Sequence, residues 1–152
     1  MVARALSRDD IAFGRAVLLA TDSLGMSAEG AFWLYDNRDE KWRYFLVSTL
    51  FGRINSRELY LRLNEALSKT LSERETQDFL LYIASPSEKF VRDIRGHIKT
   101  DRHTSDPKSA TVKIGGKMVK AWIYRLATQL NENTAKRVQR RFRRRTNELK
   151  AA

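Results

Sequence analysis

Cysteine is absent from the 152-residue sequence. Its absence excludes disulfide bonds, thiolate zinc sites and a cysteine nucleophile together. Long apolar runs are missing too, because none approaches the roughly 20 residues that a membrane span needs. Near the N-terminus, Asp9, Arg15 and Asp22 interrupt the apolar pattern, which argues against a signal peptide. We therefore expect a soluble, cytoplasmic protein with no membrane span.

Motifs for nucleotide binding and nucleophilic catalysis are also missing. The sequence contains no G-x-x-x-x-G-K-[ST], no G-x-G-x-x-G and no G-x-S-x-G pattern. The stretch Gly115-Gly116-Lys117 is typical of a hairpin turn rather than of a strand-to-helix phosphate loop. Enzyme activity stays open on this basis, but the sequence favours a non-enzymatic protein, with no cofactor and no catalytic residue to name.

The two histidines form the only imidazole cluster. His97 and His103 lie near Asp101 and Asp106, an arrangement that raises the alternative of a metal-dependent nuclease. The spacing between the histidines places them on different helical faces and matches no standard zinc motif. We therefore expect no metal site, with His97 at the end of a helix, where the dipole favours it.

The sequence does contain enough hydrophobic residues to form the core of one folded domain. Hydrophobic residues make up 42% of the chain, including 3 Trp, 5 Tyr and 7 Phe. Helical spacing of apolar residues predicts three helices, capped by Ser7, Asn55 and Ser87. Aromatic and β-branched runs predict strands at residues 31–35, 42–48, 79–84, 110–114 and 118–126.

The connections between these strands predict the topology. A polar loop of six residues joins the first two strands, and Gly115-Gly116 joins the last two, so each pair reads as a β-hairpin. A strand–helix–strand unit from residue 42 to residue 84 suits a crossover between parallel strands. The expected fold is α+β: a five-stranded mixed, mainly antiparallel sheet with two hairpins, three packing helices and a basic C-terminal helix.

The first hairpin is apolar on both of its faces. Phe32 and Leu34 point to one side, while Trp33 and Tyr35 point to the other. We expect this hairpin to lie in a central position in the fold, with other parts of the chain packed on each of its faces. An exposed aromatic platform for stacking bases is the alternative.

The strand segments AFWLY, WRYFLVS and AWIYRL carry a resemblance to a group of small bacterial α+β proteins with no assigned function. The resemblance covers roughly residues 9–126. It implies a fold and no activity, and it implies that the basic segment after Leu126 is an addition to a compact body. We therefore divide the chain into a compact domain at residues 1–128 and a basic, partly helical extension at residues 129–152.

Charge is concentrated at residues 135–150. Eight basic side chains stand there against the single acid Glu148, which accounts for +7 of the whole-chain charge of +11. Val138, Phe142 and Leu149 fall close to one helical stripe, and like-charged pairs at i,i+4 oppose the isolated helix by roughly 1–2 kcal/mol in total. We expect a segment that is partly disordered alone and becomes helical against an anion. If the apolar stripe packs on the sheet instead, the segment is part of the fold.

Nucleic acid is the partner that this charge favours, because arginine makes bidentate contacts with phosphate. A basic helix docked on an acidic protein is the alternative, and a membrane surface is a weaker one. DNA or RNA, and the oligomeric state, stay open. The predicted nucleic-acid-binding residues are Lys136, Arg137, Arg140, Arg141, Arg143, Arg144 and Arg145, with a second surface formed by Lys113, Lys117, Lys120 and Arg125.

Overall fold

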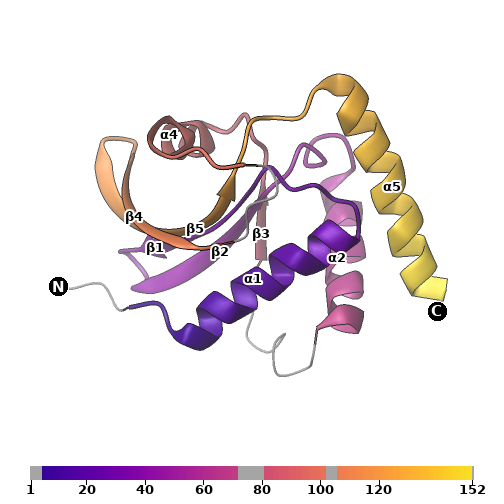
Figure 1. Cartoon of the computed structure of the whole chain (residues 1–152), viewed down its shortest axis with the longest axis horizontal. Helices are drawn as coiled ribbons and strands as arrows, with labels where there is room; N and C mark the ends of the chain where they lie inside the picture. The colour runs from indigo at the N-terminus through magenta and orange to yellow at the C-terminus, as the bar shows by residue number, and fades with distance from the viewer. Residues whose placement is uncertain (1–4, 72–80, 102–105, 152) are drawn as a thin grey trace.

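A five-stranded sheet with the order β3-β2-β1-β5-β4 lies at the centre of the molecule (Figure 1). The structure is a computed structural model, and it describes residues 5–71, 81–101 and 106–151. β2 and β3 run parallel, and the other neighbours run antiparallel, so the predicted mixed sheet is confirmed. The strands are β1 (Gly30–Asp36), β2 (Lys41–Val47), β3 (Leu81–Ala84), β4 (Lys108–Ile114) and β5 (Lys117–Leu126).

Helices cover both faces of this sheet. α1 (Arg8–Ser23), α2 (Ser56–Thr70) and α5 (Glu132–Ala151) contribute to one hydrophobic cluster with Trp33 and Tyr44 of the sheet. α4 (Lys89–His97) covers the other face, where it packs on a second cluster that contains Phe32 and Val112. The predicted α+β fold, including its C-terminal helix, is confirmed.

Two of the three predicted helix caps are present. Ser7 Oγ accepts a hydrogen bond from the amide of Asp10 at 3.0 Å, and Asn55 Oδ1 accepts one from the amide of Arg57 at 3.0 Å. The prediction that Ser87 caps α4 is wrong. Ser87 Oγ lies 2.9 Å from Ser85 Oγ within the preceding turn, and Glu88 occupies the N-cap position without a side-chain capping bond.

Both predicted hairpins form. β1 lies in the middle of the sheet with both faces covered, and Trp33 and Tyr35 are buried. The alternative of an aromatic platform on β1 is therefore wrong, because these rings belong to the core. In the second hairpin Gly115 and Gly116 have φ values of 56° and 83°, the positive values that a tight hairpin turn requires.

Some predicted features lie outside the described residues. They are the first two residues of the strand expected at 79–84 and His103. His97 ends α4, as expected, and its side chain is exposed.

Candidate functional site

The basic C-terminal segment is a helix that packs on the body of the protein. Val138 and Phe142 of α5 are buried in the same hydrophobic cluster as Leu18 of α1 and Leu63 of α2. Phe142 has no exposed surface, and Thr146 continues the buried side one turn later. The expectation of a partly disordered arm is therefore wrong. The apolar stripe of α5 packs on the hydrophobic surface formed by α1, α2 and the sheet.

On one side of α5, arginines bond to the C-terminal end of α1 and to the segment that follows it. Arg141 Nη2 donates to the carbonyl oxygen of Gly25 at 3.2 Å and to Ser27 Oγ at 3.0 Å, and Arg145 Nη1 donates to the carbonyl oxygen of Ser23 at 2.8 Å. Carbonyl oxygens at the end of a helix lack intrahelical donors and carry the negative end of the dipole. Arg145 therefore caps the last turn of α1, and Arg141 holds α5 to the segment that follows this helix.

Gly25 makes this contact possible. Its φ is 75°, and a Cβ atom at this position would lie 2.4 Å from Nε of Arg141. A side chain would therefore meet both backbone strain and a steric clash.

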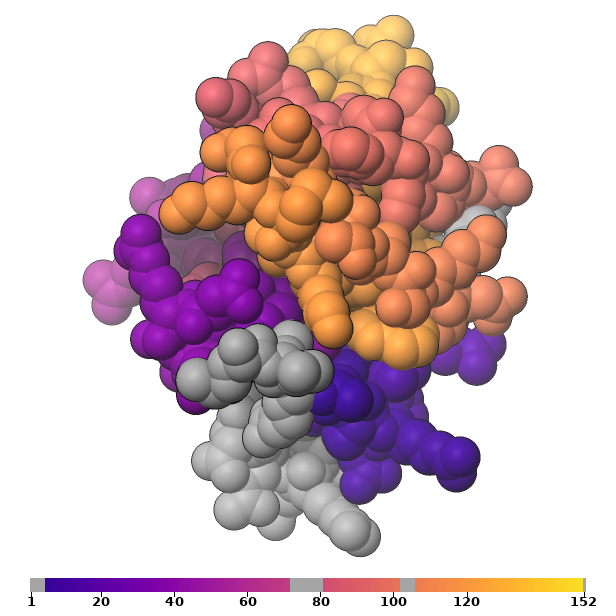
Figure 2. All heavy atoms as spheres, turned by 90° about the vertical axis from the view of Figure 1, so that its left-hand side faces the viewer, coloured from indigo at the N-terminus to yellow at the C-terminus, as the bar shows by residue number. Residues whose placement is uncertain are grey.

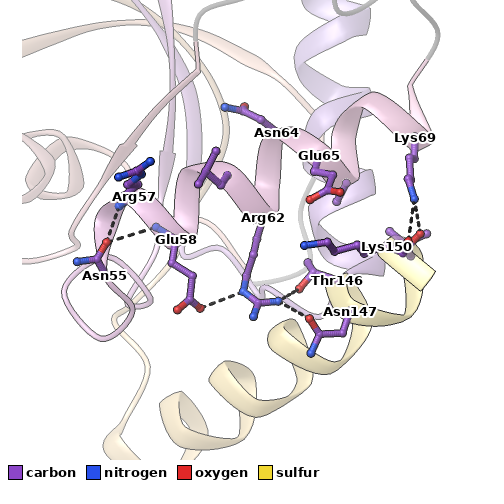
Figure 3. Close-up of a pocket in the computed structure, with 13 residues that line it drawn as sticks. Asn55, Arg57, Glu58, Arg62, Asn64, Glu65, Lys69, Thr146, Asn147 and Lys150 are labelled. Atoms are coloured by element: carbon purple, nitrogen blue, oxygen red, sulfur yellow. Dashed lines mark hydrogen bonds and ion pairs between the residues drawn. The ribbon is translucent and has the colours of Figure 1, made fainter. Parts of the chain in front are cut away.

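On the other side of α5, polar groups tie the helix to α2. Glu58 accepts hydrogen bonds from Nε of Arg143 at 3.0 Å and from Nε of Arg62 at 2.9 Å. The bond from Arg143, with that from Arg62, lowers the pKa of the Glu58 carboxyl below its ordinary value. Arg62 Nη1 also donates to Thr146 Oγ1 at 3.0 Å and to Asn147 Oδ1 at 2.7 Å (Figure 3).

A groove with a volume of about 860 Å³ runs between α2 and α5. Figure 3 shows Arg62 of α2 directed across it toward Asn147 of α5, with Glu58 of α2 beside Arg62. At its far end, Nζ of Lys69 donates to the carbonyl oxygen of Leu149 at 2.6 Å. The polar groups in the middle of this groove therefore bond to one another and hold the two helices together.

The outward side of α5 carries the cations that this docking leaves available. Lys136, Arg137, Arg140 and Arg144 are exposed there, and we call these four residues the outer stripe. At 1.5 Å per residue the stripe runs for ~12 Å along one side of the helix. Among the described residues, Lys136 and Arg140 have no polar partner. Arg137 donates to Thr134 Oγ1 at 3.3 Å, and Arg144 lies 3.9 Å from Glu148 between two largely exposed side chains.

The second predicted surface is only partly present. Lys113, Lys117 and Lys120 are exposed on the β4–β5 hairpin. Arg125 is only 2% exposed and donates through Nη2 to Asp22 Oδ2 at 2.8 Å. Its assignment to a binding surface is therefore wrong, because a buried, paired guanidinium cannot reach a partner.

The sequence did not single out Glu29, a buried carboxylate at the start of β1. It accepts hydrogen bonds from the amide of Thr49 at 2.9 Å and from that of Leu130 at 3.3 Å, and from the Thr49 hydroxyl. Burial raises the pKa of Glu29 above its ordinary value, although these hydrogen bonds act in the opposite direction. Glu29 thereby links the ends of β1 and β2 to the segment that leads into α5. No local sequence pattern marks such a role.

Neither a metal-binding cluster nor a membrane-spanning helix is present in the described part of the chain. No group of three or more His, Asp or Glu side chains there is placed to hold a metal ion. Of the described helices, none has the length and apolar character to cross a membrane. Comparison of the chain with protein-family models, curated proteins and solved structures found no match.

Proposed function

We propose that this protein binds nucleic acid without catalysing a reaction, through contacts between the outer stripe of α5 and backbone phosphates. One observation carries the proposal. Arg141, Arg143 and Arg145 bond to the body of the protein, whereas the four outer-stripe cations face solvent from a helix that is held in place. Cations gathered on one side of a packed helix form a positive surface that attracts backbone phosphates.

The docking of α5 favours binding because the helix is already ordered. A disordered segment has to lose conformational entropy when it binds, and that loss weakens affinity. Arginine also presents a planar donor fork that suits phosphate. Contacts of this kind hold a protein on the backbone and carry no sequence information. We therefore propose binding that shows little preference for base sequence.

The number of available cations sets the salt dependence. Four phosphate contacts give a slope of about −3.6 for log affinity against log salt on a B-form duplex. A mobile arm using every basic residue of the segment would give a steeper slope. The slope therefore reports whether the docked helix or a free arm makes the contacts.

Fluorescence anisotropy with a labelled duplex tests the proposal. We expect wild-type protein to bind with this slope and the stripe variant to lose most of its affinity. The stripe variant is Lys136→Gln, Arg137→Gln, Arg140→Gln and Arg144→Gln. A matched control removes four exposed cations elsewhere and should bind as wild type does. The control variant is Arg8→Gln, Arg15→Gln, Lys41→Gln and Arg57→Gln.

Two outcomes contradict the proposal. Equal loss of affinity in the stripe and control variants would indicate attraction by net charge without a defined site. If wild-type protein binds no nucleic acid, but captures an acidic protein partner after nuclease treatment, the stripe serves a protein interface instead.

A further inference from the structure

A second basic surface lies on the β4–β5 hairpin. Lys113, Lys117 and Lys120 are exposed, and we call these three residues the hairpin surface. Lys113 is paired with Met118 and Lys120 with Thr111, so these two lysines lie on one face of the hairpin near its end. Lys117 is paired with Ile114 and lies on the opposite face, so the three lysines surround the end of the strand pair. Met118 is 59% exposed, which shows that this end of the hairpin projects from the core. Within the described chain, none of the three lysines is ion-paired.

The hairpin surface and the outer stripe lie at opposite ends of the molecule. Figure 1 shows the β4–β5 hairpin on the left and α5 on the right, with α1, α2 and the rest of the sheet between them. Figure 2 looks toward the hairpin end, and α5 is visible there only at the far edge. The two basic surfaces therefore do not merge into one patch.

This separation matters because duplex nucleic acid is stiff. Its persistence length is about 50 nm, whereas a domain of this size has a radius of gyration of about 15 Å. One straight duplex that lies on α5 does not bend round the body to reach the hairpin. Both surfaces can be occupied at once only when two duplex segments bind to one molecule.

We propose that the protein bridges two segments of duplex nucleic acid, one on the outer stripe and one on the hairpin surface. The proposal rests on the proposed function, since it takes phosphate binding by α5 as its first contact. The hairpin surface supplies two lysines on one face of the strand pair and a third on the other face, and each acts as a point charge without the fork of arginine. The second duplex is therefore held more weakly than the first.

Salt distinguishes the two contacts. A rise from about 50 to about 200 mM salt lowers affinity by ~150-fold for four phosphate contacts and by ~40-fold for three. Because the hairpin contact starts weaker, bridging disappears at a lower salt concentration than binding of the first duplex. A titration that follows both signals shows two separate midpoints.

A bead assay measures bridging directly. Biotinylated DNA duplex is immobilised, full-length protein is added, and retention of a second, fluorescent duplex is recorded. The hairpin variant, Lys113→Gln, Lys117→Gln and Lys120→Gln, should retain at least about tenfold less of the second duplex, since each lost phosphate contact weakens binding. Its anisotropy titration with a single duplex should stay close to that of wild type.

The control variant and one single substitution complete the assay. The control variant with exposed cations removed elsewhere should bridge as wild type does. Lys117→Glu, a single charge reversal at the exposed first residue of β5, provides a second test should the triple substitution disturb the fold. Circular dichroism and sedimentation confirm that every variant keeps the fold and the mass of wild type.

The outcomes separate the inference from the function on which it rests. If wild type binds one duplex but retains no second, bridging is refuted and nucleic-acid binding stands. Unchanged bridging in the hairpin variant also refutes the inference. It would indicate that the lysines instead keep the exposed β4 edge from pairing with a strand of another molecule. If wild type binds no duplex at all, both proposals fail.

Discussion

Replacement of Phe142 by alanine tests whether α5 is part of the fold. The ring is fully buried among residues of α1, α2 and the sheet, and it is among the largest side chains without exposed surface. Truncation of a buried Phe to Ala costs about 3–5 kcal/mol, because transfer free energy is lost and a cavity is left. For a chain of this length each kcal/mol lowers Tm by about 2–4 °C. We therefore expect Phe142→Ala to lower Tm by about 6–20 °C.

Thermal and urea unfolding, followed by circular dichroism, measure this loss. The matched control is Arg140→Ala, two residues earlier on the exposed side of the same helix. A surface substitution of this kind changes the free energy of unfolding by about 0.5 kcal/mol or less. Removal of one like-charged neighbour of Lys136 and Arg144 acts in the stabilising direction.

The two arrangements of the C-terminal segment give different results. If α5 were a mobile arm, Phe142 would contact solvent, and its truncation would leave Tm and the urea midpoint unchanged. Equal Tm values for wild type, Phe142→Ala and Arg140→Ala would therefore refute the docking of α5. Loss of stability in Phe142→Ala alone would show that the body of the protein depends on the helix.

Three more predictions follow from single residues. Gly25→Ala should destabilise the fold more than Gly52→Ala in urea unfolding, because both have positive φ but only Gly25 lies against Arg141, and equal effects would argue against that contact. The pKa of Glu29 is higher in the folded protein than its unfolded value of 4.5, so this group stabilises the fold at low pH, and that stabilisation is lost as pH rises through the folded pKa. The stability of wild type relative to Glu29→Gln should therefore fall as pH rises from 4.5. The lowered pKa of Glu58 has the opposite sign: the stability of wild type relative to Glu58→Gln should shrink as pH falls below 4.5, and a pH-independent difference would contradict the ion pairs with Arg62 and Arg143.

Elements with local signals could be predicted from the sequence. The turn at Gly115 and Gly116 needs two positive φ values, and few residue pairs supply them as readily. The cap at Asn55 is likewise a property of a few neighbouring residues. The cap of α4 was misassigned because Ser85, Ser87 and Glu88 all suit an N-terminus, and only the turn geometry distinguishes them.

The candidate site needed contacts that no local pattern contains. The run of arginines identified α5 as the basic element, but its bonds to Ser23, Gly25, Ser27 and Glu58 join residues far apart in the sequence. The burial of Arg125 likewise depends on a contact that no local sequence pattern predicts. Its position in a basic hairpin suggested a surface role, whereas the carboxylate of Asp22, 103 residues earlier, holds it inside.

Docking divides the charges of α5 into two groups with separable effects. Arg143 bonds to α2 and Arg141 bonds to the segment after α1, so their loss should lower stability whether or not a partner is present. Arg140 and Lys136 face solvent, so their loss should weaken phosphate binding while leaving Tm nearly unchanged. A free basic arm predicts no such division, because every cation would then contribute alike to binding and none to stability. Paired measurements of Tm and affinity on one inward and one outward substitution therefore decide whether the binding surface is a docked helix.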